Sequence, residues 1–327
     1  MEGLAVADPT DPIRLGIVGL GAMGAEMLAV ATAAPGVEVV HAADPSTEAV
    51  QRAARDHPAI LIGTDPDAVV RSDAIDAIYI AAPPLHHADY AVRALDAGKA
   101  VFCEKPLAID LDDGRAMVAA AQRSGLVNAV NFALADRHAA LEVERAVRAG
   151  EAGDVRGVDI RLTFPTWPRS FQKDAHWLSQ AEQGGMLREV LSHFIYLTDR
   201  LLGPLEPVLL DARRPDAGSS ETSVFGLLTA GDVPVRILAR ADAALPETYE
   251  WELHGARRSY RLIDWGELSV SEGAAWTPIA LEAERGTEAT RLAEFARAVR
   301  RSEAARLPDF ETALRVQTII EAFHDGA

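Results

Sequence analysis

The first part of the chain repeats one pattern, in which a short apolar run leads through a turn into a segment of helical periodicity. Apolar runs lie within residues 13–24, 37–44, 68–84, 97–106 and 126–132, and stretches such as 22–34 and 86–98 have helical spacing. Continuous apolar strands that alternate with helices are typical of a parallel sheet covered on both faces. We therefore predict a doubly wound α/β domain.

The first apolar run leads into a glycine motif, Gly19-Leu20-Gly21-Ala22-Met23-Gly24. A GxGxxG motif alone is weak, but this one follows a predicted strand and opens a predicted helix. An acidic residue, Asp44, ends the next strand 20 residues beyond Gly24. This combination is the dinucleotide fingerprint, in which the glycines permit a tight turn, close approach of the pyrophosphate and close helix–strand packing. The helix N-terminus stabilises the phosphate charge.

Asp44 indicates which dinucleotide binds. Its carboxylate would accept hydrogen bonds from the adenosine ribose and repel a 2′-phosphate, and the sequence ADPSTEAV offers no nearby arginine to bind one. NAD is therefore expected in preference to NADP. Two alternatives remain: Asp44 is only a helix cap or turn residue, or the glycine turn is structural and binds no nucleotide.

The fifth strand ends in the sequence VFCEKPLA, which delivers Glu104 and Lys105 to the carboxyl edge of the sheet, where ligands bind. The chain has three lysines and otherwise uses arginine. An ammonium group can exchange its proton, whereas a guanidinium cannot. Lys105 is therefore a candidate catalytic residue, and the alternative is a surface lysine after a strand.

A third motif, GGMLREVLSHF, spans residues 184–194. Read as a regular helix, it places Glu189 and His193 at i and i+4, on one face. The pair is compatible with a catalytic group, a metal site or a buried hydrogen bond.

Charge and composition exclude several classes of function. The net charge of −17 argues against nucleic acid and against an anionic membrane surface. The single cysteine, Cys103, excludes an intrachain disulfide. The N-terminal residues show no signal peptide, and no apolar run reaches membrane-spanning length. A cytoplasmic location is expected.

The glycine motif, the stretch AAPPLHHADYAVRALDAGKAVFCEKPLA and the motif GGMLREVLSHF together resemble the Gfo/Idh/MocA family of NAD(P)-dependent oxidoreductases. The likeness extends from about Ile13 to Phe323, and the proline pair, His87, Gly98 and the Glu-Lys-Pro run carry it most strongly.

This resemblance implies a Rossmann domain, assigned to residues 1–132, and an α+β substrate and oligomerisation domain, assigned to residues 133–327. The second domain would have a large open, mostly antiparallel sheet that forms a homo-oligomer interface, and C-terminal helices that pack back on the first. The sequence agrees independently, because stretches at 155–164, 223–230, 233–243, 247–255 and 258–264 have the pattern of antiparallel strands.

The resemblance also supplies a set of expected site residues. His87 either lines the nicotinamide pocket or caps the following helix. The residues expected to bind the cofactor are Gly19, Gly21, Ala22, Met23, Gly24, Asp44, Ala82, Pro83, His87, Glu104 and Lys105.

The expected catalytic residues are Lys105, His193 and Glu189. His193 would exchange the substrate hydroxyl proton, while Lys105 would hydrogen-bond the same oxygen. Glu189 would hold a second hydroxyl or orient the imidazole. Alternatively, Glu189 pairs with an arginine and His193 is a satisfied core histidine. No metal is expected, because the motif offers two ligands where a metal site needs three or four.

The third motif departs from the family pattern at two positions. Glu189 stands where aspartate is usual, and Leu191 stands where glycine is usual. The expected function is NAD(P)-dependent hydride transfer to or from a sugar, polyol or similar small molecule. The alternatives are an imine or non-sugar ketone reductase, and a regulatory protein that binds the cofactor without turnover.

Overall fold

The computed structural model describes residues 11–172, 175–281 and 286–325. The prediction that the N-terminus carries no signal peptide concerns a segment that lies almost entirely outside the described residues. The chain forms two compact units: residues 1–132 with 287–314, and residues 133–286 with 315–327. Each unit is described by itself.

The first unit contains a six-stranded, fully parallel sheet in the order β3-β2-β1-β4-β5-β6. This arrangement confirms the predicted doubly wound domain. The strand order reverses between β1 and β4, and the crevice at such a switch point is where ligands bind. The strands are β1 (Ile13–Val18), β2 (Val37–Ala43), β3 (Leu61–Gly63), β4 (Ala77–Ile80), β5 (Ala100–Cys103) and β6 (Asn128–Val130).

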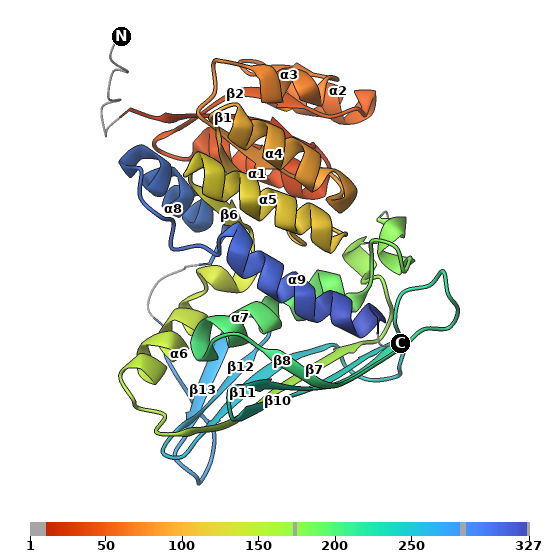
Figure 1. The fold of residues 1–327 in the computed structure, drawn as a ribbon, viewed down its shortest axis with the longest axis vertical. Helices are drawn as coiled ribbons and strands as arrows, with labels where there is room; N and C mark the ends of the chain where they lie inside the picture. The colour runs from red at the N-terminus through yellow and green to blue at the C-terminus, as the bar shows by residue number, and fades with distance from the viewer. Residues whose placement is uncertain (1–10, 173–174, 282–285, 326–327) are drawn as a thin grey trace. The chain divides into compact units, whose positions relative to one another are not determined.

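Three helices of this unit, at residues 47–56, 66–71 and 111–124, begin where a short polar side chain caps them. Ser46, Asp65 and Asp110 each accept a hydrogen bond from a backbone N–H of the first turn that follows. The helices are α1 (Ala22–Ala33), α2 (Thr47–Asp56), α3 (Pro66–Arg71), α4 (His87–Asp96), α5 (Leu111–Ser124) and α8 (Glu288–Arg301), with a short 3₁₀ turn, η1 (Pro84–His86) (Figure 1).

The second unit contains an eight-stranded sheet in the order β14-β13-β12-β11-β7-β10-β9-β8. The pairing of β10 with β7 is parallel and the other pairings are antiparallel, which confirms the mostly antiparallel sheet. The strands are β7 (Val155–Phe164), β8 (Glu206–Arg213), β9 (Ser223–Ala230), β10 (Val233–Ala241), β11 (Thr248–Gly255), β12 (Ser259–Ile263), β13 (Glu267–Ser271) and β14 (Thr277–Pro278).

The two faces of this sheet differ. On one face of the sheet, alternate residues of the strands are apolar and buried. The helices α6 (His138–Arg148) and α7 (Ser192–Leu202) lie along this face, as does the part of α9 (Phe310–Asp325) that begins at Arg315 (Figure 1). Leu209, Phe225 and Leu238 instead point to the opposite face and are about half exposed. Within the described part of this unit, no helix covers that face in Figure 1.

The motif at 184–194 is not a regular α-helix, so the prediction made from its spacing is wrong in part. Leu187–Leu191 form a π-helical turn, and α7 begins only at Ser192. The wider turn changes the angle between successive side chains, so an i, i+4 relation across it no longer guarantees a shared face. Isolated π-helical turns are frequent at functional sites.

In the part of the chain that the structure describes, no helix is both long enough and apolar enough to cross a membrane.

Candidate functional site

The three glycines of the loop after β1 have different surroundings. A Cβ at Gly19, whose φ is +93°, would meet the Ala81 backbone at 2.5 Å, and one at Gly24 would meet the Gly19 carbonyl oxygen at 1.9 Å. A Cβ at Gly21 would meet nothing within 4 Å. Gly19 and Gly24 therefore serve chain packing, whereas Gly21 leaves open space beside the backbone. A pyrophosphate needs such space in a dinucleotide site.

The N-terminus of α1 is prepared for an anion. Its N-cap is Gly21, no side chain caps it, and its first turn holds no acidic residue. The unpaired N–H groups and the positive end of the helix dipole favour a phosphate there. Ala22 and Met23, which begin the helix, are exposed. The residues present therefore fit a dinucleotide.

Asp44 follows β2 and closes the glycine loop. Its Oδ2 accepts from the Leu20 N–H at 2.7 Å, and its Oδ1 accepts from the Ser46 N–H at 2.7 Å. The cap of α2 is Ser46, so Asp44 is not the helix cap. Each carboxylate oxygen has a second lone pair, so these two bonds leave Asp44 able to accept from ribose hydroxyls.

His87 is fully buried at the start of α4. Its Nδ1 lies 2.9 Å from the Pro106 carbonyl oxygen and its Nε2 lies 2.8 Å from the Ala82 carbonyl oxygen. Burial lowers the pKa of the ring, although the two carbonyls act in the opposite direction. His87 therefore ties together the segments that follow β4, with Ala82 and Pro83, and β5. Its side chain makes no helix cap.

Glu104, directly after β5, is held in a buried network. Its Oε1 accepts from the Asn131 amide at 2.7 Å and from the Tyr79 hydroxyl, and its Oε2 accepts from the Lys105 N–H at 3.3 Å. Burial first, and then the charge of Glu288, raises the pKa of the carboxyl group. The peptide between Lys105 and Pro106 is cis.

The network extends to α8, which is distant in sequence but belongs to the same unit. The Asn131 amide also donates to Glu288 Oε2 at 2.8 Å, and Arg291 Nε donates to Asn131 Oδ1 at 2.6 Å. Arg291 forms an ion pair with Glu288. The backbone that carries Lys105 is thus anchored by side chains from several elements.

In the second unit, Glu189 lies in the π-helical turn and is paired with an arginine. Its Oε1 accepts from Arg169 Nη2 at 3.1 Å and from Gln172 Nε2 at 2.7 Å. The side chains of Glu189 and Arg169 are 15% and 10% exposed, respectively. The carboxylate is therefore fixed and largely neutralised by protein groups, as in the arginine-pairing alternative raised by the sequence.

His193 is in the first turn of α7 and is 5% exposed. Its Nδ1 accepts a hydrogen bond from the Ala133 N–H at 3.1 Å. A backbone amide can only donate, so Nδ1 carries a lone pair and the proton of the neutral ring is on Nε2. This contact selects the tautomer in which Nε2–H is a donor.

An aromatic group surrounds His193. The Trp265 ring lies 5.2 Å from the imidazole at an interplanar angle of 85°, and it also contacts the rings of Phe194 and Tyr249, each at 5.2 Å. The Tyr249 hydroxyl accepts from Arg169 Nη1 at 3.0 Å. Ring contacts and hydrogen bonds thus connect the two candidate residues of this unit, His193 and Glu189.

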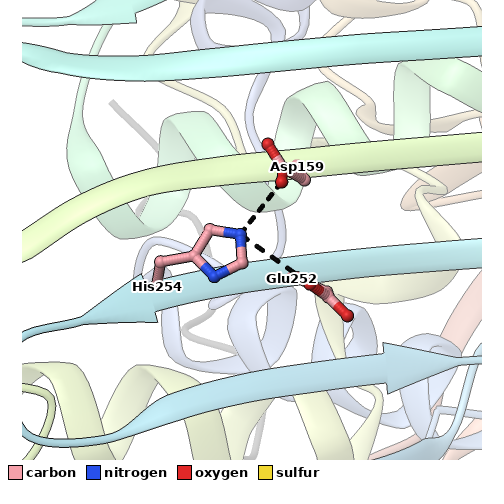
Figure 2. A group of neighbouring side chains, drawn as sticks. All are labelled: Asp159, Glu252 and His254. Carbon is pink, nitrogen blue, oxygen red and sulfur yellow. Dashed lines mark hydrogen bonds and ion pairs between the residues drawn. The ribbon is translucent and has the colours of Figure 1, made fainter.

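Among the described residues, one group has three potential metal ligands within reach of one another: Asp159, Glu252 and His254. His254 Nε2 lies 3.0 Å from Asp159 Oδ2 and 3.7 Å from Glu252 Oε2 on neighbouring strands β7 and β11 (Figure 2). The carboxylates also pair with Arg236 and Arg261, which balance their charge. The group contains neither Glu189 nor His193.

Several residues that shape these regions were not found from the sequence. They reach the site from distant segments and follow no spacing rule. Two signals were present: Asn131 directly follows an apolar strand, and Trp265 precedes Gly266 in a turn where a small residue is usual. The residues missed are Tyr79, Asn131, Arg169, Gln172, Tyr249, Trp265, Glu288 and Arg291.

Two family models match the chain. The model described as "Oxidoreductase family, NAD-binding Rossmann fold" matches residues 13–132, and the model described as "GFO/IDH/MocA C-terminal domain" matches residues 140–261. The chain belongs to the Gfo/Idh/MocA family. It is an oxidoreductase with a Rossmann domain that binds a nicotinamide dinucleotide, as the resemblance implied.

Curated members of the family include dTDP-3,4-didehydro-2,6-dideoxy-alpha-D-glucose 3-reductase of Streptomyces violaceoruber, which is 29% identical over 304 residues, 89% of this chain and 86% of that protein. The scyllo-inositol 2-dehydrogenase (NAD(+)) of Bacillus subtilis (strain 168) is 31% identical over 144 residues, which are 43% of this chain and 42% of that protein.

Among solved structures, KijD10, a 3-ketoreductase from Actinomadura kijaniata in complex with NADP and TDP-benzene, is 25% identical. It matches with a TM-score of 0.83 over 97% of this chain and 98% of that chain.

Proposed function

We propose that the protein transfers a hydride between a nicotinamide cofactor and a carbinol or carbonyl carbon of a sugar, polyol or sugar-like molecule. The observation that carries the proposal is the state of His193, a buried neutral imidazole whose Nε2–H is a donor because Ala133 occupies Nδ1. A fixed neutral donor suits a substrate oxygen that gains negative charge during reaction. Relatives named as a sugar-nucleotide reductase and an inositol dehydrogenase support the substrate class.

NAD is the preferred cofactor in this proposal. Bound nicotinamide would accept or supply the hydride, and the chain supplies the glycine loop, the α1 N-terminus and Asp44 to hold the dinucleotide. Asp44 lies at the loop, and the next arginine, Arg52, is an exposed α2 residue near Glu48. A 2′-phosphate would therefore meet a carboxylate without a matching cation. The names of the relatives include both NAD and NADP, so the preference rests on Asp44.

The two candidate groups divide the chemistry in this proposal. Lys105 exchanges the proton of the substrate hydroxyl, because an ammonium group can lose and regain a proton. His193 was expected to exchange that proton, but here it donates its Nε2–H to the reacting substrate oxygen and keeps its proton, because protonation of Nδ1 would lose the bond from Ala133. Glu189, already paired with Arg169, shapes the substrate surface instead of accepting the proton.

The first test is a screen of NAD reduction against sugars, inositols, sugar acids and simple alcohols. Oxidation of at least one polyol or sugar is expected. Tight binding of NADH together with silence on the whole panel and on the corresponding ketones would contradict the proposed substrate class.

Substitutions then separate the two roles. Lys105→Ala and Lys105→Arg should both lower kcat about 100-fold or more, because arginine keeps the charge but cannot exchange the proton. His193→Ala should cost about 100-fold, whereas His193→Gln, which retains an N–H donor, should cost about tenfold or less. A His193→Gln variant as impaired as His193→Ala, with the loss of one limb of the pH profile, would instead make His193 the base.

We further propose that the protein forms a homo-oligomer through the open face of the eight-stranded sheet. Phe225 and Leu238 are direct cross-strand neighbours on that face, and Leu209 lies one strand further on β8. Adjacent exposed apolar side chains on a sheet mark an interaction surface. Light scattering should find a dimer or larger oligomer, and Phe225→Asp with Leu238→Arg should yield monomers. A monomeric wild-type protein would rule the interface out.

A further inference from the structure

The hairpin between β12 and β13 reverses through a turn that does not suit its sequence. Gly266 N–H donates to the Ile263 carbonyl oxygen at 3.1 Å, and the two central residues, Asp264 and Trp265, have φ values of 46° and 67°. Positive φ at two successive positions is a feature of the type I′ turn, which favours Asn-Gly or Asp-Gly. Aspartate tolerates the first position, whereas glycine is expected at the second.

Tryptophan at that second position is exceptional. In the described ranges, the residues other than glycine with positive φ are Asp242, Asp264, Trp265 and Ser302. Trp265 alone in this group is bulky, and a bulky side chain is disfavoured in this backbone conformation. Backbone strain of this kind persists where the surroundings require it, and it gathers at functional sites. The turn would form more readily with glycine, so the reason for the indole lies in what it contacts.

The indole contacts the groups on which the proposed function depends. Its edge-to-face contact with His193 has a centroid distance of 5.2 Å and an angle of 85°. Its contact with Tyr249 leads through the hydroxyl of that residue to Arg169, which pairs with Glu189. One side chain of the turn thus touches the imidazole directly and is one ring away from the arginine that holds Glu189.

The hydrogen bond from Ala133 fixes one atom of the imidazole but not the plane of the ring. A hydrogen bond at Nδ1 does not by itself set the plane of an imidazole or the direction of its Nε2–H. An indole packed perpendicular to the imidazole removes this freedom, because edge-to-face aromatic contacts have a preferred geometry. Both contacts act on the same ring: the hydrogen bond selects its tautomer, and the indole restricts its plane.

We propose that Trp265 is a positioning residue that holds His193 with its Nε2–H aimed at the substrate oxygen. The turn accepts an unfavourable residue because the indole orients the imidazole. This inference rests on the proposed function for its effect on catalysis, while the effect on the imidazole itself is independent of any substrate.

The test compares three single variants. Trp265→Gly removes the indole and gives the turn the Asp-Gly sequence that its backbone favours. Trp265→Phe keeps an aromatic ring, and Asp264→Gly relieves the neighbouring position while leaving the indole in place. Each variant is measured for kcat and KM, for the affinity of NADH and for thermal unfolding.

Trp265→Gly should lower kcat about tenfold, less than the loss expected from His193→Ala, because the imidazole is still present but misplaced. The affinity for NADH should stay within about twofold of wild type, since no cofactor-binding group is changed. Trp265→Phe should recover most of the lost rate, and Asp264→Gly should react within about twofold of wild type. A Trp265→Gly variant that folds and keeps its kcat would overturn the proposal.

A second measurement needs no substrate. Nitrogen–proton correlation spectra of the imidazole groups identify the tautomer of His193. The His193 signal is assigned as the one that is missing from the spectrum of His193→Gln. Wild type should show a single Nε2–H tautomer, and Trp265→Gly a mixture or a broadened signal. An unchanged signal in Trp265→Gly would overturn the positioning role. If the substrate screen fails, this measurement still decides the inference, so the two failures are distinguishable.

Discussion

The glycine loop after β1 and the π-helical turn before α7 are arranged in opposite ways. At the loop the backbone is left open: a Cβ on Gly21 would touch nothing, and no side chain caps α1. At the π-helical turn the polar side chains already have protein partners, because Arg169 and Gln172 bind Glu189 and Ala133 binds His193. The first region is built to receive a ligand on its backbone, and the second fixes its side chains in advance.

This difference explains why the glycine loop keeps the family pattern, whereas the π-helical turn departs from it. A backbone site depends on glycines at fixed spacing, so its motif is retained in full. A side-chain site depends on pairs made across the fold, so Glu189 in place of aspartate is accommodated by the arginine and glutamine that reach it. Five experiments test the contrast, from the largest expected effect to the smallest.

Two glycines three residues apart should behave differently. Gly24→Ala places a Cβ 1.9 Å from the Gly19 carbonyl oxygen and should lower the free energy of unfolding by about 4 kcal/mol. Gly21→Ala should change it by less than about 0.5 kcal/mol but weaken NADH binding about tenfold or more, because the methyl group enters the open space. Denaturant unfolding and fluorescence titration measure the two effects. Equal destabilisation by both variants would remove the distinction between packing and binding glycines.

Glu189 should contribute to stability as well as to the substrate surface. Glu189→Ala leaves the largely buried Arg169 without this carboxylate and should cost about 3 kcal/mol of unfolding free energy. Glu189→Asp, the residue usual in the family, should cost about half as much, since a side chain one methylene shorter cannot keep both bonds. Urea denaturation measures the loss. If neither variant is destabilised, the pair contributes nothing to stability and the side-chain region is not prearranged.

Each unit contains a histidine whose pKa burial lowers, the fully buried His87 in the first and the half-buried His324 in the second. Burial and the nearby charges of Arg188 and Arg214 lower the pKa of His324 to about 3. In the unfolded chain this ring takes up a proton below about pH 6.5, while the folded ring stays neutral, so stability falls as pH falls from 6.5 toward 3.

The expected loss from His324 between pH 6.5 and 4.5 is about 2 kcal/mol. His324→Gln should flatten this part of the stability profile, as measured by urea unfolding at a series of pH values. A variant whose profile remains parallel to that of wild type would assign the acid sensitivity to other groups.

Asp44 tests the selectivity of the cofactor region. Asp44→Asn keeps an oxygen acceptor for the glycine loop but removes the charge that repels a 2′-phosphate. The ratio of NADH to NADPH affinity should fall about tenfold, which corresponds to about 1.4 kcal/mol. Titration of both cofactors on both proteins gives the ratio. A wild-type protein that prefers NADPH would refute the role of Asp44.

The smallest effect is expected from metal removal. Neither candidate region needs a metal in this reaction, so dialysis against a chelator should leave kcat unchanged. The Asp159, Glu252 and His254 group provides the control, because His254→Ala should also leave kcat unchanged. Loss of activity that zinc restores would make a metal part of the site.

The cofactor half was largely predictable because its determinants are local in sequence. The order of strands, the glycine spacing and Asp44 follow from short-range patterns, and the parallel sheet brings the carboxyl ends of its strands to one edge. Strand position and residue spacing already made Lys105 and His193 candidates, the resemblance to the family added their expected roles, and those roles remain predictions. Sequence patterns could not predict the hydrogen-bond network around Glu104, because two of its members, Arg291 and Asn131, are 160 residues apart.

The sequence by itself determined the family, the α/β fold and the identity of the groups available for chemistry. Only the tertiary structure decided their states. The π-helical turn replaced the expected α-helical spacing, Arg169 engaged the Glu189 carboxylate, and Ala133 selected the tautomer of His193. These states depend on contacts with side chains and backbone groups of distant segments. Such contacts form only when the chain folds and brings the segments together.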